Sequence, residues 1–330
     1  MAAMILMTLD HISLCRKVRA TPTVFWRNCR TVCPRDATIN AWEMFFQPVN
    51  PNIEEKAKKV LCLGNAIGPE ELWALTSNVF FQNPSLFKNR PAIENLLNLG
   101  FRPRDAGSFK GEAVITRDIR MKANGLLQEY VKVTPKIQMM VDQFYSKHLS
   151  KYNVLAVHIR GTDHSSETED GKLPPLSVWI QNAKHILKSL PSLNKIFVAS
   201  DNAESIKRFV DEFGETVVYT KAFRAKKYDG DPVHASGADP YMIGSQVLVD
   251  ILVMAKCKHF LHAESSVAAL VAYFNPDIES HFLEQKIMLL VGDYLSGRQG
   301  ACVLFGVDDE DDDKERFSFL ESGLPHRKPD

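Results

Sequence analysis

Short apolar runs alternate with amphipathic stretches along the second half of the chain. Residues 154–160 and 195–201 are almost continuously apolar, which is typical of strands buried on both faces of a parallel sheet. The same criteria predict helices over 176–190, 202–213, 245–255 and 265–273, and further strands over 215–219 and 259–262. The alternation of strand and helix predicts an α/β fold, in which a parallel sheet is covered by helices on both faces.

The first half has weaker periodicity. Residues 4–17 predict a helix, and residues 121–149 form a longer amphipathic stretch in which Pro135 marks the start of a second helix. Further short elements are predicted as a strand over 23–26 and helices over 70–79 and 91–99. We therefore expect three parts, which are an N-terminal α/β domain over residues 1–149, a C-terminal Rossmann-like domain over 150–285 and an extension over 286–330.

The composition argues against several classes of protein and of site. The 330 residues include 40 lysines and arginines and 40 aspartates and glutamates, and this zero net charge argues against a dedicated nucleic-acid or anionic-membrane binder. The apolar stretches are far shorter than the roughly 20 residues that span a bilayer, and the N-terminus lacks the basic region of a secretion signal. Six cysteines without a C-x-x-C pair predict buried free thiols rather than a zinc site. Six consecutive acidic residues over 308–313 predict a solvated tail.

Polar residues at strand ends carry the candidate chemistry, because ligands of open α/β sheets bind beyond the carboxyl ends of the strands. The first strand of the second half ends in His158-Ile159-Arg160-Gly161-Thr162-Asp163. Strand alternation places His158 and Arg160 on one face, and Gly161 allows a ligand to approach the backbone. The planar fork of Arg160 suits a phosphate, and a salt bridge to Asp163 is the structural alternative.

Other candidates follow the later strands. Asp201 either contacts a ligand or caps the next helix. Asp250 is the only charge in the apolar run 247–255, so its carboxylate needs donors, which the backbone, an arginine or a bound base would supply. Ser265 and Ser266 precede the last helix, where they would cap it and leave its positive end for an anion.

Several common motifs are absent. The chain has neither a G-x-x-x-x-G-K-[ST] loop nor a G-x-G-x-x-G fingerprint after a strand. Asp229-Gly230-Asp231 matches the D-x-D by which metal-dependent glycosyltransferases hold Mn²⁺ or Mg²⁺, but it follows a polar segment instead of an apolar strand. We interpret it as a loop turn, and we expect no metal cofactor.

The strand-end motifs resemble the fucosyltransferase superfamily that includes the α-1,6-fucosyltransferases, the rhizobial nodulation fucosyltransferase and the protein O-fucosyltransferases. The resemblance is carried by residues 158–163, 197–201, 248–251 and 257–273, and more thinly by residues 22–27 and 41–46. It implies the GT-B arrangement, in which two Rossmann-like domains face a cleft and the C-terminal one holds GDP-fucose.

The resemblance also implies residue roles. Arg160 would contact the β-phosphate, His158 and Asp250 the guanine, and Ser265 or Ser266 the diphosphate, with Asp201 in the same nucleotide site. The implied reaction is a metal-independent, inverting transfer of fucose to a glycan or glycoprotein hydroxyl, in the Golgi or secretory lumen. The candidates for the carboxylate that accepts the proton are Asp163, Glu167 and Glu169.

One departure from the family keeps alternatives open. Relatives begin with a strand and a glycine-rich loop, and we expect the N-terminal domain of this chain to lack both. A catalytically inactive sugar-nucleotide or glycan-binding relative is therefore the first alternative to an enzyme. A phosphate-ester hydrolase using His158 and Arg160 is disfavoured, because no nucleophile lies beside them in the motif.

Overall fold

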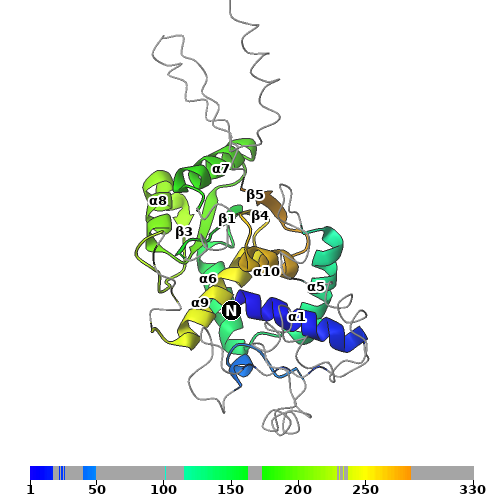
Figure 1. Ribbon diagram of the computed structural model, residues 1–330. Coiled ribbons are helices and arrows are strands. Elements are labelled where there is room, and N and C mark those ends of the chain that lie inside the picture. The colour runs from blue at the N-terminus through cyan, green and yellow to red at the C-terminus, as the bar shows by residue number, and fades with distance from the viewer. Residues whose placement is uncertain are drawn as a thin grey trace, which may run out of the picture. The chain divides into compact units, whose positions relative to one another are not determined.

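The fold is built around a parallel β-sheet. The structure, a computed structural model, describes residues 1–17, 22, 24, 26, 40–49, 101, 115–162, 173–228, 230, 233 and 237–283. Within these residues the sheet has five strands, all paired in parallel, in the order β3-β2-β1-β4-β5 (Figure 1). The strands are β1 (Val154–Ile159), β2 (Lys195–Ser200), β3 (Val217–Val218), β4 (His259–His262) and β5 (Glu279–Phe282).

Helices cover both faces of this sheet. Helices α7 (Leu176–Ser189) and α8 (Ala203–Phe213) lie on one face, where Trp179 and Phe209 share a core with Val157 of β1. Helices α6 (Pro135–His148), α9 (Pro240–Ala255) and α10 (Ser266–Phe274) cover the other face, where Ala156 and Phe197 join their core (Figure 1). The predicted α/β class, with a parallel sheet covered on both faces, is confirmed.

The burial of the two central strands explains their composition. All six residues of β1 are buried, and so are the last five of the six in β2. Strands covered on both sides favour continuous apolar sequence. Their register pairs Ile159 with Ser200, so that Arg160 and Asp201 leave the sheet next to each other.

The strand order creates a topological switch point beside β1. The chain moves from β1 outward through β2 to β3, then crosses back through α9 to β4 on the other side of β1 and continues to β5. In open α/β sheets, ligands bind outside the carboxyl ends of the strands at such a point. The carboxyl ends of β1 and β4 therefore mark the expected binding crevice.

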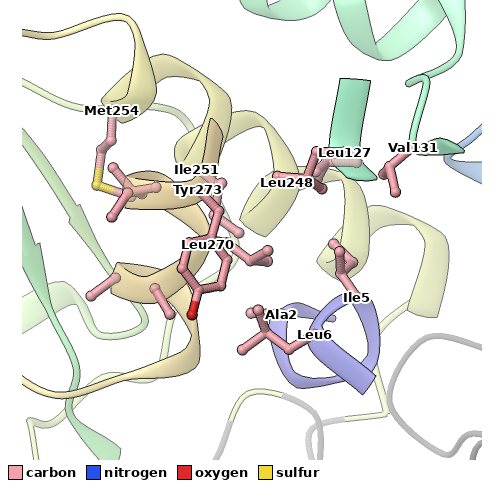
Figure 2. Close-up of a cluster of buried hydrophobic side chains, with 14 of the residues drawn as sticks. Ala2, Ile5, Leu6, Leu127, Val131, Leu248, Ile251, Met254, Leu270 and Tyr273 are labelled. Atoms are coloured by element: carbon pink, nitrogen blue, oxygen red, sulfur yellow. The ribbon is translucent and has the colours of Figure 1, made fainter. Parts of the chain in front are cut away.

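The described N-terminal elements pack on α9 and α10. They are α1 (Ala2–Lys17), the short 3-10 helix η1 (Ala41–Met44), α5 (Arg117–Tyr130) and α6. Figure 2 shows apolar side chains from α1 and α5 meeting those of α9 and α10 in one cluster, whose labelled members include Ile5, Leu127, Leu248 and Leu270. Burial of this apolar surface stabilises the packing of α1 and α5 on α9 and α10.

Most predicted elements in the second half are confirmed, and three differ. Helix α9 begins at Pro240, five residues before the predicted start, because the Asp239 side chain accepts from the amides of its first turn. Strand β3 is only two residues long, and β5 was not predicted. The predictions for residues 23–26, 70–79, 91–99 and 308–313 lie wholly or mostly outside the described residues.

The chain divides into two units, Met1–Leu283 and Glu284–Asp330. The domain boundaries proposed from sequence, and the two-domain cleft, stay predictions. None of the helices in the described part combines the length and apolarity that crossing a bilayer requires. Cys257 is a buried free thiol as predicted, and burial raises its pKa to about 12.

Candidate functional site

An ion pair joins the carboxyl ends of β1 and β2. Arg160 Nη1 donates to Asp201 Oδ2, and the same carboxylate accepts from the Gly161 amide at 3.1 Å and from Thr162 Oγ1 at 3.0 Å. Both charged side chains keep some exposure, 29% for Arg160 and 17% for Asp201. Asp201 thus fixes the turn that follows β1 and holds the guanidinium at the rim of the sheet.

Asp201 does not cap the following helix. Asn202 takes that position, since its side-chain oxygen accepts from the Ser205 amide at 2.8 Å. Arg160 forms an ion pair with Asp201, whereas the salt bridge to Asp163 that the sequence suggested stays a prediction, because Asp163 lies outside the described residues. Direct contact of Asp201 with a ligand stays a prediction.

Tyr228 packs against the turn after β1. Thr162 adopts a left-handed backbone with φ 53°, and its amide donates to the Tyr228 carbonyl at 2.6 Å. A Cβ on Gly161 would lie 2.6 Å from that carbonyl and 2.5 Å from Asn202 Nδ2. Tyr228 and Asn202 therefore approach Gly161 closely, and approach of a ligand to this backbone stays a prediction. Left-handed backbone in a threonine is strained, and such strain often marks functional sites.

The start of α10 lies beside β1. Ser265 Oγ accepts from the Ala268 amide at 3.0 Å, which makes it the N-cap, and it lies 3.3 Å from Nδ1 of the buried His158. Ser266 is the first residue of the helix and is half-buried. The positive end of α10 and the His158 ring therefore meet at the switch point, where an anion would be stabilised.

His262 is a further site residue that sequence reasoning missed. The register places it opposite His158 on the neighbouring strand. Burial lowers its pKa to about 4, and its Nδ1 lies 3.1 Å from the Ala263 carbonyl. A neutral imidazole thus lines this edge at physiological pH. His262 ends the strand predicted over 259–262, and polar residues at strand ends were the ones selected as candidates. Its position in the sequence could therefore have identified it.

Asp250 lies on α9 and is buried. Its Oδ1 accepts from Thr220 Oγ1 at 2.7 Å, and no other hydrogen bond to the carboxylate occurs within the described residues. Burial raises its pKa to about 6, and the hydrogen bond from Thr220 and then the attraction of Arg224 oppose that rise. The sequence left open whether an arginine, the backbone or a base satisfies Asp250. The structure supplies the Thr220 hydroxyl as the donor, and Arg224 acts on Asp250 through its charge alone. Contact with a base stays a prediction.

The remaining candidates are not placed. Asp163, Glu167 and Glu169, and also Asp229 and Asp231, lie outside the described residues. Among the residues that the structure does describe, no group of three or more His, Cys, Asp or Glu side chains could hold a metal ion. Metal independence therefore stays a prediction.

Comparison with known proteins identifies the family. Residues 8–274, most of the chain, match the family described as Nodulation protein Z (NodZ). The chain belongs to the NodZ family. It is 22% identical over 237 residues to Nodulation protein Z of Bradyrhizobium diazoefficiens, covering 66% of this chain and 61% of that protein. The chain thus spans less than two thirds of the length of this curated relative.

Two solved structures have partial similarity to this chain. A crystal structure of NodZ alpha-1,6-fucosyltransferase soaked with GDP-fucose is similar over 82% of this chain and 87% of that chain, at 16% identity and a TM-score of 0.49. POFUT1 in complex with GDP-fucose is similar over 50% of this chain and 49% of that chain, at 13% identity and a TM-score of 0.34.

The NodZ match contains the whole described site. His158, Arg160, Asp201, Asp250 and Ser265 all lie within residues 8–274. The family resemblance inferred from the strand-end motifs is confirmed.

Proposed function

We propose that this NodZ-family chain is a metal-independent, inverting glycosyltransferase that moves fucose from GDP-fucose to a hydroxyl of a glycan or glycoprotein. The observation that carries the proposal is that β1 ends in Arg160 at the switch point of the sheet, while His158 of the same strand lies 3.3 Å from Ser265, the N-cap of α10. A relative solved after soaking with GDP-fucose and described as an alpha-1,6-fucosyltransferase supports it.

The donor would lie along the carboxyl ends of β1 and β4. Arg160, oriented by Asp201, offers a planar set of donors that suits the β-phosphate. The amino end of α10, capped by Ser265, adds positive potential for the same diphosphate. His158 and Asp250 would bind the guanine, because a carboxylate accepts from its N1 and N2 hydrogens whereas adenine offers no matching pair of donors.

The reaction follows from where charge develops. The acceptor hydroxyl attacks C1 of fucose from the face opposite GDP, so a new C1–O bond forms as the bond to the β-phosphate oxygen breaks. The electron pair of the broken bond leaves with GDP, whose added negative charge Arg160 and the end of α10 stabilise. The acceptor proton passes to a carboxylate, for which Asp163, Glu167 and Glu169 are the candidates.

The acceptor would bind between two Rossmann-like domains, as in the GT-B arrangement. Attack from the opposite face inverts the configuration at C1, and this stereochemical outcome is measurable.

Incubation of the full chain with GDP-fucose and a panel of oligosaccharide and glycopeptide acceptors tests the proposal. We expect release of GDP that depends on the acceptor, together with a fucosylated product whose anomeric configuration, read by NMR, is opposite to that of the donor. Binding of GDP-fucose without product from any acceptor would instead identify a nucleotide-sugar-binding protein.

A further inference from the structure

Arg224 links the ends of two strands beside the candidate nucleotide site. It lies in the segment between β3 and α9, and its guanidinium donates to the carbonyls of Ser200 at 3.1 Å, Ala222 at 3.3 Å and Thr220 at 2.9 Å. Ser200 ends β2, and Thr220 follows β3. The side chain therefore holds the carboxyl ends of both strands from one point.

Thr220 contacts both Arg224 and Asp250. Its carbonyl accepts from Arg224, while its hydroxyl donates to Asp250 Oδ1 at 2.7 Å. Within the described residues, Arg224 is also the charged group that acts on Asp250. The helix that carries Asp250 is otherwise apolar around it, and Tyr219 lies against Arg224 with its ring centroid 5.7 Å from the guanidinium carbon. In this part of the chain, the Thr220 hydroxyl and the positive charge of Arg224 both favour the ionised form of Asp250.

We propose that Arg224 is a positioning residue for guanine recognition, which keeps Asp250 ionised so that its second oxygen accepts a hydrogen bond from the base. This inference rests on the proposed function, because it assigns Asp250 to the guanine of GDP-fucose. Arg224 acts through Asp250, since its guanidinium donors are directed at backbone carbonyls. It thereby adds a residue from a loop to a site otherwise built from strand ends and helices.

The electrostatics give the direction of the effect. Burial raises the pKa of Asp250 to about 6, and Arg224 and Thr220 both oppose that rise. A protonated carboxyl group would present a donor where guanine also presents donors, so GDP affinity must fall as Asp250 takes up a proton. The positive charge of Arg224 favours the ionised carboxylate, so loss of that charge would raise the pKa of Asp250 further toward neutral pH.

Two variants separate the charge of Arg224 from its hydrogen bonds to the backbone carbonyls. Arg224→Gln keeps an amide donor for the carbonyls but removes the charge, whereas Arg224→Lys keeps the charge but loses the planar fork. Lys226→Gln is the matched control, because it removes one positive charge from an exposed side chain two residues away. A purely structural Arg224 predicts similar losses in both Arg224 variants, with no change in pH dependence.

Isothermal titration with GDP between pH 5.5 and 8.5 tests the inference. For Arg224→Gln we expect the midpoint of the pH dependence to rise by about one unit or more, which makes GDP binding about fivefold weaker than wild type at pH 6 and nearly equal at pH 8.5. Arg224→Lys and Lys226→Gln should keep the wild-type midpoint. In an Asp250→Asn background, Arg224→Gln should cause no further shift of the midpoint.

A wild-type midpoint in folded Arg224→Gln would overturn the inference. If that variant does not fold, an upward shift of one unit in Arg224→Lys, which retains the charge, would overturn it as well. Absence of GDP binding by the wild-type chain at every pH would refute the proposed function itself, and this result is distinct from an unchanged midpoint.

Discussion

Replacement of Asp250 by asparagine should stabilise the protein while it weakens nucleotide binding. The carboxyl pKa rises from 3.8 to about 6, mainly because of burial, so folding is penalised whenever Asp250 is ionised. A raised carboxyl pKa contributes stability below its unfolded value of about 4, and that contribution is lost as the pH increases through about 6. Asparagine has a similar shape, carries no charge and retains an oxygen that can accept from Thr220.

The size of the stability effect follows from the pKa. A rise of about two units at about 1.4 kcal/mol per unit corresponds to about 3 kcal/mol at pH 8. We therefore expect Asp250→Asn to melt several degrees above the wild type at pH 8 and at nearly the same temperature at pH 4. The difference should appear between these limits, as wild-type Asp250 ionises.

The same substitution should reduce affinity for GDP. It places an amide donor where a carboxylate oxygen would accept from guanine, and mismatched buried polar groups cost about 1 to 3 kcal/mol. Discrimination between GDP and ADP should shrink in parallel, because the carboxylate is the group that would distinguish the two bases.

Thermal melts across pH, combined with calorimetry, provide the assay. Asp211→Asn is the control, because it changes an exposed carboxylate paired with Lys207 on α8 and should shift stability by under about 1 kcal/mol. A lower melting temperature for Asp250→Asn at pH 8, with GDP affinity unaltered below the melt, would contradict both expected effects. Asp250 would then be a structural hydrogen-bonding residue of the core.

Three further changes test other parts of the site. Arg160→Lys should raise the activation free energy of transfer by about 1.5 to 3 kcal/mol in steady-state kinetics, and unchanged kinetics would leave Arg160 a structural role. Gly161→Ala should lower the free energy of unfolding by about 1 to 3 kcal/mol in denaturant titrations, because its Cβ would lie 2.6 Å from the Tyr228 carbonyl. The control Gly125→Ala, whose Cβ would face open space on α5, should not destabilise the protein. EDTA should leave GDP binding and transfer intact, and a loss of activity restored by Mn²⁺ would instead implicate residues 229–231.

The central strands and the site edge could be predicted because their sequence reflects burial. Segments covered on both faces become continuous apolar runs, and β1 and β2 are of this kind. Alternation along β1 then placed His158 and Arg160 on one face, and the structure brings both to the edge where Asp201 and Ser265 lie. Local pattern was sufficient here because each residue is positioned by its own strand or helix.

Other features depend on contacts between distant segments. Strand β5, with the sequence Glu-Ser-His-Phe, lies at the edge of the sheet and lacks a buried apolar run, so its pattern does not indicate a strand. The partners of Asp250, which are Thr220 and Arg224, lie in an irregular segment without periodicity. The contact of Tyr228 with the turn after β1 likewise joins positions more than sixty residues apart.

Calorimetric binding of GDP, GDP-fucose, GMP and ADP to the full chain tests the central claim most directly. We expect GDP and GDP-fucose to bind, GMP to bind about tenfold or more weakly because it lacks the β-phosphate for Arg160, and ADP to bind more weakly than GDP. Equal affinity for GMP and GDP, or no binding of either GDP or GDP-fucose, would contradict it.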